Sequence, residues 1–247
     1  MDVATYYERY WSESGLHPQR KSNPGLTSLI AARIPLGSKL LDVGCGNASI
    51  CGQCLPHGYD YLGVDVSENA VSEARAAGIN ARKIDDASSL PFPDGTFDAA
   101  LCLEVFEHLF LPEVAATEIL RVLKPGGVLI VTVPNTAYWR RRVELLLGYW
   151  NPFGDELSRK QPWRDPHIRF FTRPSLHRML ASAGFSRVST GGHSTEYAGL
   201  FAGARGLRKL YFAAHSSLAY RLVESRFPSL FALRIHAVAF KPRAQRS

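Results

Sequence analysis

The sequence predicts an α/β fold in which helices cover a mostly parallel sheet. Short apolar runs alternate with amphipathic stretches along the 247 residues, as repeated strand–helix–strand units require. The nearly unbroken apolar run 128–133 is typical of a central parallel strand that is buried on both faces. Gly44 and Gly46 follow another apolar run as a Gly-x-Gly turn, which lets a strand turn sharply into a helix while a ligand approaches the backbone.

The same periodicity places seven strands and the helices between them. Turn and capping residues set their ends: Pro24 and Ser67 begin helices, Gly78 and Gly184 end them, and the segment 124–127 is expected to form a turn. The predicted strands are 39–43, 59–64, 79–84, 97–103, 128–133, 185–189 and 231–240, and the predicted helices are 23–34, 47–55, 67–78, 112–123, 172–183 and 207–223.

Three acids at the ends of the predicted strands, one just before the glycine turn and two after strands, indicate a nucleotide-cofactor pocket. We expect Asp42 to bind an ammonium group, Asp65 the two hydroxyls of a ribose, and Asp86 an adenine amino group. A dinucleotide fingerprint would need a third glycine where Ser49 stands, so a cofactor with an amino-acid tail, a ribose and an adenine fits better. The competing interpretation is that Asp65 and Asp86 only cap helices or turns.

This combination resembles the class I S-adenosylmethionine-dependent methyltransferases over roughly residues 38–190. The resemblance implies a Rossmann-like three-layer sandwich, with a seven-stranded, mostly parallel sheet whose last strand is antiparallel. It also implies S-adenosyl-L-methionine as the cofactor and methyl transfer as the enzymatic activity. The motifs that carry it are Leu41-Asp42-Val43-Gly44-Cys45-Gly46, Gly63-Val64-Asp65-Val66-Ser67, Leu90-Pro91-Phe92, Phe97-Asp98, Glu107-His108-Leu109 and Arg121-Val122-Leu123-Lys124-Pro125-Gly126-Gly127.

The family's motifs also assign the cofactor contacts and a finer branch. Many members have a third glycine where this chain has Ala48. The segments 133–140 and 162–172 are similar to the MetW-like branch of methyltransferases of type 11/23. The residues that the resemblance assigns to the cofactor are Asp42, Gly44, Cys45, Gly46, Asp65, Val66, Asp86, Ala87 and Leu103.

We expect one methyltransferase domain, because the length suits a single α/β unit with insertions. Within residues 1–247, cap helices occupy 1–37 and the cofactor-binding core occupies 38–134. Segments 135–170 and 191–228 are expected to be insertions on the substrate side, since loops of that length in compact domains are usually functional.

Four residues are candidates for the chemistry at the acceptor. Glu104, Glu107 and His108, with His167 downstream, are similar to the Glu-x-x-Glu-His pattern of metal-assisted O-methyltransferases that act on ubiquinone precursors and small-RNA ends. Two carboxylates and two imidazoles could hold a divalent ion, but metal-free relatives use such residues to shape the pocket rim, and we assign no metal. An alcohol acceptor needs a base, so we expect His108 and His167 to be catalytic; the competing interpretation for each is a packing role.

The charge distribution suggests an anionic acceptor. Residues 1–135 carry 10 basic and 16 acidic side chains, whereas 136–247 carry 19 and 6. This asymmetry favours an acidic partner, unless the C-terminal half only presents a solvated basic face. We therefore predict O-methylation of a small or glycan-like, acidic acceptor. The insertion residues expected to cover it are Tyr138, Trp139, Arg140, Arg141, Arg142, Trp150, Trp163 and Arg164.

Other functions stay open. An RNA methyltransferase would explain the basic half, although the chain has no recognisable RNA-binding module, so nucleic acid is not the expected partner. A non-catalytic cofactor-binding partner that regulates methionine metabolism is compatible with the MetW-like resemblance. The basic helix 207–223 could contact an anionic membrane from the periphery. With no signal peptide or spanning segment in the sequence, we expect a cytoplasmic protein. The oligomeric state is not predicted.

Overall fold

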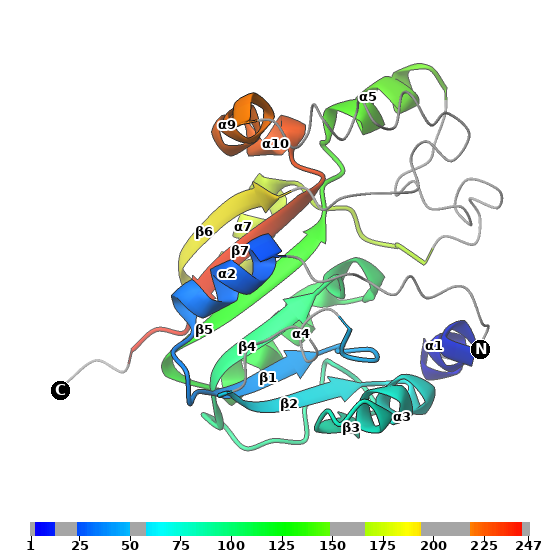
Figure 1. Ribbon diagram of the computed structural model, residues 1–247, viewed down its shortest axis with the longest axis vertical. Helices are drawn as coiled ribbons and strands as arrows, with labels where there is room; N and C mark the ends of the chain where they lie inside the picture. Colours follow the sequence, from blue (N-terminus) through cyan, green and yellow to red (C-terminus); the bar gives the residue numbers. More distant parts are fainter. Residues whose placement is uncertain (1–2, 13–23, 50–57, 149–165, 194–217, 244–247) are drawn as a thin grey trace.

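The computed structural model describes residues 3–12, 24–49, 58–148, 166–193 and 218–243. Its strands form one seven-stranded sheet in the order β3-β2-β1-β4-β5-β7-β6 (Figure 1). β7 runs antiparallel to both β5 and β6, so the mostly parallel sheet with an antiparallel last strand is confirmed. The strands are β1 Lys39–Val43, β2 Asp60–Asp65, β3 Ala81–Lys83, β4 Phe97–Leu103, β5 Leu123–Pro134, β6 Ser186–His193 and β7 Arg234–Phe240.

Helices cover both faces of this sheet, which gives the three layers of the predicted sandwich. α2 packs on one face, and α4 and α7 pack on the other. α5, α9 and α10 stand beyond the carboxyl ends of the central strands (Figure 1). The helices are α1 Val3–Ser12, α2 Pro24–Arg33, α3 Glu68–Ala76, the 3₁₀ turn η1 Phe106–His108, α4 Pro112–Val122, α5 Trp139–Leu146, α7 Arg173–Ser182, α9 Leu218–Arg226 and α10 Pro228–Phe231.

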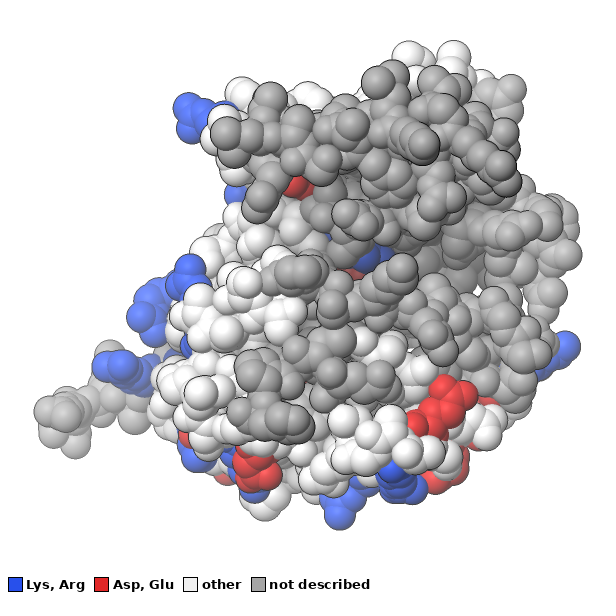
Figure 2. All heavy atoms as spheres, in the orientation of Figure 1, with Lys and Arg blue, Asp and Glu red and all other residues white. Residues whose placement is uncertain are grey.

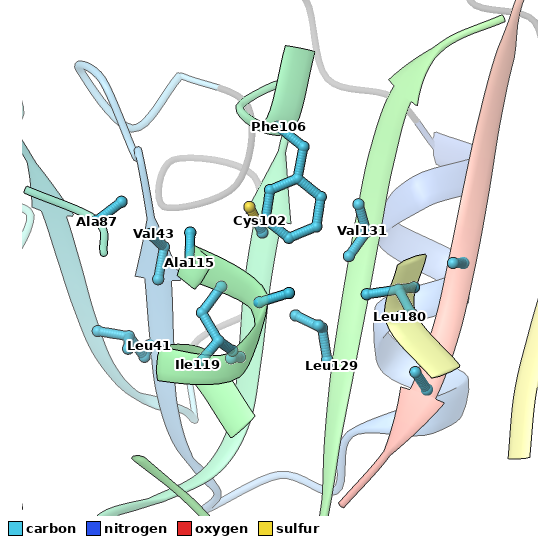
Figure 3. Packing of buried hydrophobic residues seen from close by; sticks show 14 of the residues in the cluster. Leu41, Val43, Ala87, Cys102, Phe106, Ala115, Ile119, Leu129, Val131 and Leu180 are labelled. Atoms are coloured by element: carbon cyan, nitrogen blue, oxygen red, sulfur yellow. The ribbon is translucent and has the colours of Figure 1, made fainter. Parts of the chain in front are cut away.

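The alternation of side chains along the central strands explains why both faces are apolar. Leu41 and Val43 of β1 point toward Ile119 of α4, in the larger core cluster drawn in Figure 3. Leu40, which directly precedes Leu41 in the same strand, points to the opposite face, where it joins Ile30 of α2. All of these side chains are removed from water, and this burial is the main stabilisation of the fold.

Capping residues start the helices where the sequence places them. The hydroxyl of Ser67 accepts a hydrogen bond from the amide of Ala70 (3.2 Å), which begins α3. Thr172 and Ser175 cap α7 reciprocally, in a capping box. Each hydroxyl satisfies a backbone amide that has no partner inside the first turn of its helix.

Several predicted boundaries are wrong. Residues 47–49 are not helical, since Ala48 has a positive φ of 59°; the rest of the predicted helix 47–55 lies outside the described residues. Segment 124–127 extends β5 instead of forming only a turn, because Gly126 and Gly127 continue the ladder through hydrogen bonds with Lys241. β6 continues to His193, so that strand takes the first residues assigned to the insertion 191–228.

The C-terminal region also differs from its prediction. The predicted strand 231–240 begins only at Arg234, because residues 228–231 form the short helix α10 with Pro228 in its first turn. α9 accounts for the end of the predicted helix 207–223, and residues 207–217 lie outside the described part. The division of the chain into one domain with two insertions stays a prediction.

Charges of both signs lie on the described surface. Figure 2 shows Lys and Arg along one edge and the base of this face, with Asp and Glu near α3 and again at the base, and no continuous basic field among the described atoms. None of the helices within the described ranges has the length and apolar character that crossing a membrane requires.

Asn135 joins the C-terminal region to the central sheet. It directly follows β5 and is buried, and its side-chain amide donates to the carbonyls of Ser229 (3.1 Å) and Ala232 (2.7 Å). Its Oδ1 accepts from the amide of Ala137 at 3.0 Å. One side chain thus satisfies backbone groups of α10 and of the segment leading to α5.

We expect Asn135→Asp to lower the free energy of unfolding by about 2–4 kcal/mol at neutral pH, because an ionised carboxylate cannot donate to the buried carbonyls. Urea denaturation checks this. Asn80→Asp, an identical change at an exposed position, is the control and should shift stability by less than about 0.5 kcal/mol. Equal stability of the two variants would contradict the structural role of Asn135.

Candidate active site

The glycine turn after β1 lies against the turn after β4. The amides of Gly44 and Cys45 donate to the carbonyl of Val64 at 2.8 and 3.0 Å, which bends the chain at the end of the strand. Gly44 has a φ of 72°, and a Cβ built on it would collide with the side chain of Val105. Both the conformation and the close approach therefore require glycine here.

Asp65 ties this turn to α3. One carboxylate oxygen accepts from the amide of Gly46 (2.8 Å) and the other from the amide of Ser67 (3.0 Å). Burial raises the pKa of Asp65, and these backbone amides oppose that rise by stabilising the ionised form. Because each carboxylate oxygen can accept a second hydrogen bond, the capping role and the predicted ribose-binding role are compatible.

Asp42 is the second buried acid, and it shares a hydrogen bond with Tyr61. The hydroxyl of Tyr61 donates to Oδ2 of Asp42 at 2.7 Å. Burial raises the pKa of Asp42 from 3.8 to about 7; the Tyr61 hydrogen bond lowers it, and the neighbouring charge of Asp65 raises it. A cationic group placed against Asp42 would favour the ionised form, as the predicted ammonium contact requires.

The remaining predicted cofactor residues lie at the ends of adjacent strands. Val66 directly follows β2, and Leu103 is the buried last residue of β4. Ala87 is buried, whereas Asp86 is exposed and accepts from the amide of Ser88 at 2.9 Å, the turn-capping role that we held as the alternative. Since the sheet order is β3-β2-β1-β4, these residues line neighbouring positions along one edge.

The described cysteines, Cys45 and Cys102, lie in surroundings that disfavour the thiolate. Cys45 is buried in the glycine turn, and burial, reinforced by the charges of Asp42 and Asp65, raises its pKa well above the ordinary value. Cys102 is buried in β4, and this burial is the main reason that its pKa is also raised. Cys51 and Cys54 lie outside the described residues.

Glu107, His108 and His167 come together beyond β4. The carbonyl of Glu107 accepts from the amides of Ile168 (2.9 Å) and Arg169 (3.0 Å), which brings the downstream segment against η1. The rings of His108 and His167 stack with their centroids 4.6 Å apart, and Nε2 of each lies 3.9 Å from the same oxygen of Glu107. The carboxylate is 1% exposed, so it acts on both imidazoles through a poorly hydrated environment.

A backbone carbonyl orients one of these imidazoles. Nδ1 of His108 lies 3.3 Å from the carbonyl oxygen of Pro166, and a carbonyl can only accept, so this hydrogen bond puts the proton on Nδ1. Nε2 then carries the lone pair and faces Glu107. This arrangement can take a proton from an acceptor hydroxyl and stabilise the resulting imidazolium.

The same three residues fit a divalent cation. Their ligand atoms all lie within 4.8 Å of one another, and a carboxylate with two imidazoles suits a borderline metal that would polarise a hydroxyl. Glu104 does not belong to this group, which corrects the four-residue pattern. Its carboxylate instead accepts from Nε of Arg234 at 2.8 Å, an ion pair that joins the residue after β4 to the first residue of β7, across the intervening β5.

The insertion is described only in part. Tyr138 is buried and Trp139 is exposed, while Trp150, Trp163 and Arg164 lie outside the described residues. Arg140 and Arg141 both pair with Glu144 on the same helix, and Nε of Arg142 donates to the carbonyl of Ala137. These contacts stabilise α5, and the proposed grip on an anionic acceptor stays a prediction.

The structure adds residues that the sequence did not single out. Tyr61 could have been found from strand alternation, because it shares a face with Gly63, which pairs with Asp42. Arg234 lies 130 positions after Glu104, and Tyr7 of α1 packs its ring against that of His108 with centroids 5.8 Å apart. No local pattern connects residues so distant in the chain.

Comparison with known proteins identifies the family. A family model for a methyltransferase domain matches residues 16–190, more than half of the chain. The chain therefore belongs to the methyltransferase-domain family and is a class I S-adenosylmethionine-dependent methyltransferase. The cofactor prediction, S-adenosyl-L-methionine, is confirmed at the level of this class. The finer assignment to the MetW-like branch stays a prediction.

Individual relatives are enzymes that methylate small molecules. A 2-methyl-6-phytyl-1,4-hydroquinone methyltransferase of Synechocystis sp. is 36% identical over 124 residues, which cover 47% of this chain and 37% of that enzyme. A ubiquinone biosynthesis O-methyltransferase of Thiobacillus denitrificans is 31% identical over 74% of this chain and 82% of its own length. Three Xanthomonas oryzae enzymes of the same name match over 59% of their length.

A solved structure agrees with the fold. A methyltransferase of Thermotoga maritima, described as a possible histamine N-methyltransferase, superposes with a TM-score of 0.60 at 19% identity. The match covers 96% of this chain and 95% of that one. At this identity the likeness supports the Rossmann-like architecture and leaves the substrate open.

The raised pKa of Asp42 predicts a pH dependence of stability. The native state keeps this proton up to about pH 7, whereas an unfolded Asp releases it near pH 4. The free energy of unfolding should therefore fall as pH rises from about 4 to 7, by on the order of 3–4 kcal/mol from this group. Urea denaturation without cofactor at pH 4 and pH 8 measures it.

Asp42→Asn should remove this part of the pH dependence, and Asp60→Asn, at the exposed start of β2, should leave it in place. Tyr61→Phe should move the loss of stability to higher pH, because the hydrogen bond that favours ionisation is gone. An Asp42→Asn variant with the pH dependence of the parent protein would refute this assignment.

Proposed function

We propose that this chain transfers the methyl group of S-adenosylmethionine to a hydroxyl oxygen of a small-molecule acceptor, with His108 as the base. The observation that carries the proposal is the convergence of Glu107, His108 and His167 at the end of β4, next to the glycine turn. A sulfonium methyl group is already electrophilic, so the protein has to hold the acceptor in line with it and remove the hydroxyl proton.

Each residue of the group has a separate task. Nε2 of His108 takes the acceptor proton as the new oxygen–carbon bond forms and the sulfur–carbon bond breaks. The buried carboxylate of Glu107 stabilises the imidazolium, and the stacked ring of His167 holds His108 in place. The carbonyl of Pro166 accepts from Nδ1 and so keeps the reactive lone pair on Nε2.

The acceptor class rests on two lines of support. The relatives are named for hydroquinone and ubiquinone-biosynthesis methylation, which favours a phenolic hydroxyl. The basic C-terminal half favours an acceptor that also carries an anionic group. We therefore propose a carboxylated or otherwise anionic phenol as the preferred acceptor, ahead of the glycan-like acceptor that charge alone suggested.

The test measures release of S-adenosylhomocysteine with a panel of small phenols and hydroquinones, in matched pairs with and without a carboxylate. We expect turnover with at least one phenol, faster for its carboxylated member. His108→Asn should lower kcat about 10²- to 10⁴-fold with an unchanged cofactor affinity, since Asn keeps a donor for Pro166 but has no base. His177→Asn, an exposed histidine on α7, should have no effect.

The other outcomes separate the alternatives. If a chelator abolished turnover and a divalent metal restored it, the mechanism would use a metal held by the same three residues in place of the histidine base. Cofactor binding without turnover on any acceptor, together with a stable protein partner, would favour the non-catalytic regulator. Turnover on RNA alone would overturn the small-molecule proposal.

A further inference from the structure

The N-terminal helix lies over the cofactor edge of the sheet. α1 packs against α3, at the side of the sheet that carries β2 and β3 (Figure 1). Two hydrogen bonds fasten it: the amide of Asn69 donates to Oε1 of Glu8 at 3.2 Å, and the side-chain amide of Asn69 donates to the carbonyl of Glu8 at 3.3 Å. Glu8 therefore lies at the first turn of α3.

This position brings Glu8 close to the acid that is expected to bind the ribose. Asn69 is two residues beyond Ser67, whose amide donates to Asp65. Burial is the main cause of the raised pKa of Asp65, and the negative charge of Glu8 adds to it. The two carboxylates thus belong to one partly enclosed site, formed by α1, the end of β2 and the start of α3.

The second oxygen of Glu8 needs a donor. Within the described part of the chain, Oε2 of Glu8 is buried and accepts no hydrogen bond, whereas Oε1 is held by Asn69. A buried carboxylate oxygen next to another acid is costly unless a donor lies between them. The two hydroxyls of a ribose are such donors, and they can bridge two carboxylates with one hydrogen bond to each.

We infer that Glu8 is a cofactor-binding residue, which accepts a hydrogen bond from a ribose hydroxyl of the cofactor opposite Asp65. The inference rests on the cofactor class of this family and goes beyond the residues that its motifs assign. It gives α1 a function, because the helix then closes over the cofactor when the ribose hydroxyls bridge Glu8 and Asp65.

Closure by Glu8 also affects the acceptor side. Tyr7 precedes Glu8 on α1, and its ring packs edge-on against that of His108 with centroids 5.8 Å apart. The helix that binds the ribose through Glu8 therefore covers the proposed base with the preceding side chain, Tyr7. Cofactor binding would in this way help to exclude water from the site of methyl transfer.

Calorimetric titration with S-adenosylhomocysteine tests the inference without an acceptor. Glu8→Gln keeps an oxygen for the amide of Asn69 but loses one charged acceptor, and we expect its affinity to fall about tenfold. The fall should disappear when the titrated ligand is the 2′,3′-dideoxyribose analogue of S-adenosylhomocysteine. Hydrogen exchange should show that the ligand protects the amides of α1 in the parent protein and less in Glu8→Gln.

Two controls exclude indirect effects. Arg9→Gln changes the charge of the same helix at an exposed position and should keep the parent affinity. Asn69→Ala removes a tether of α1 without touching either carboxylate, so any loss of affinity that it causes should be equal for the ribose ligand and the dideoxy analogue. Equal losses in Glu8→Gln with the ribose ligand and the dideoxy analogue would reduce Glu8 to a tether and overturn the inference. If the parent protein did not bind S-adenosylhomocysteine, the cofactor site itself would be refuted.

Discussion

The two hydrogen bonds from backbone amides to Asp65 are the interaction on which the site depends. They join the turn after β1 to the first residues of α3, two segments that parallel strands bring to one edge but do not by themselves connect. Without the Asp65 carboxylate, the amides of Gly46 and Ser67 would lose their hydrogen-bond acceptor, and the end of the glycine turn would no longer be held to the start of α3. Gly44, with its positive φ and its close approach to Val105, forms the first part of the turn, and Asp65 fixes the last part through Gly46.

The site concentrates buried negative charge, and the protein compensates for it by different means. Asp65 is held by amides and Asp42 by a tyrosine hydroxyl, while Glu104 is held by the guanidinium of Arg234. These partners differ in how far they stabilise a buried carboxylate. An amide or a hydroxyl offsets the cost of desolvation only in part, whereas a cation also neutralises the charge. Asp42 is consequently close to half ionised at neutral pH, and a cationic ligand group would complete its neutralisation.

The parts of the fold that the sequence predicts well are those controlled by local patterns. Alternating apolar runs located the strands, and single hydroxyls such as that of Ser67 located helix starts, because each signal acts within one turn or one strand. The errors lie where a long-range contact decides. The residues around Gly126 extend a strand because β7 pairs with them, and Pro228 begins a helix before β7 can start.

The same distinction applies to the candidate site: local patterns predicted some of its residues, and long-range contacts placed the others. Asp42, Gly44 and Asp65 were predictable, since the carboxyl ends of neighbouring parallel strands must meet at one edge. The group at His108 was predictable only as a set of residue types. Its geometry depends on the amides of Ile168 and Arg169 reaching the carbonyl of Glu107, a contact across about sixty residues. Glu104 shows why spacing alone misleads: it stands at the expected interval from Glu107, yet its carboxylate pairs with Arg234 and does not join the group of Glu107, His108 and His167.

The turn after β4 links the cofactor edge to the acceptor edge. Val105 contacts the glycine turn on one side, and three residues later His108 faces the acceptor side with its proton position set by Pro166. Glu104, at the start of this turn, has a positive φ of 60°, a conformation that costs a residue with a side chain about 1–2 kcal/mol. The ion pair with Arg234 offsets that cost and holds the turn in the one shape that serves both sides. A displacement of the glycine turn would therefore move Val105, and through this short segment it would also move the proposed base.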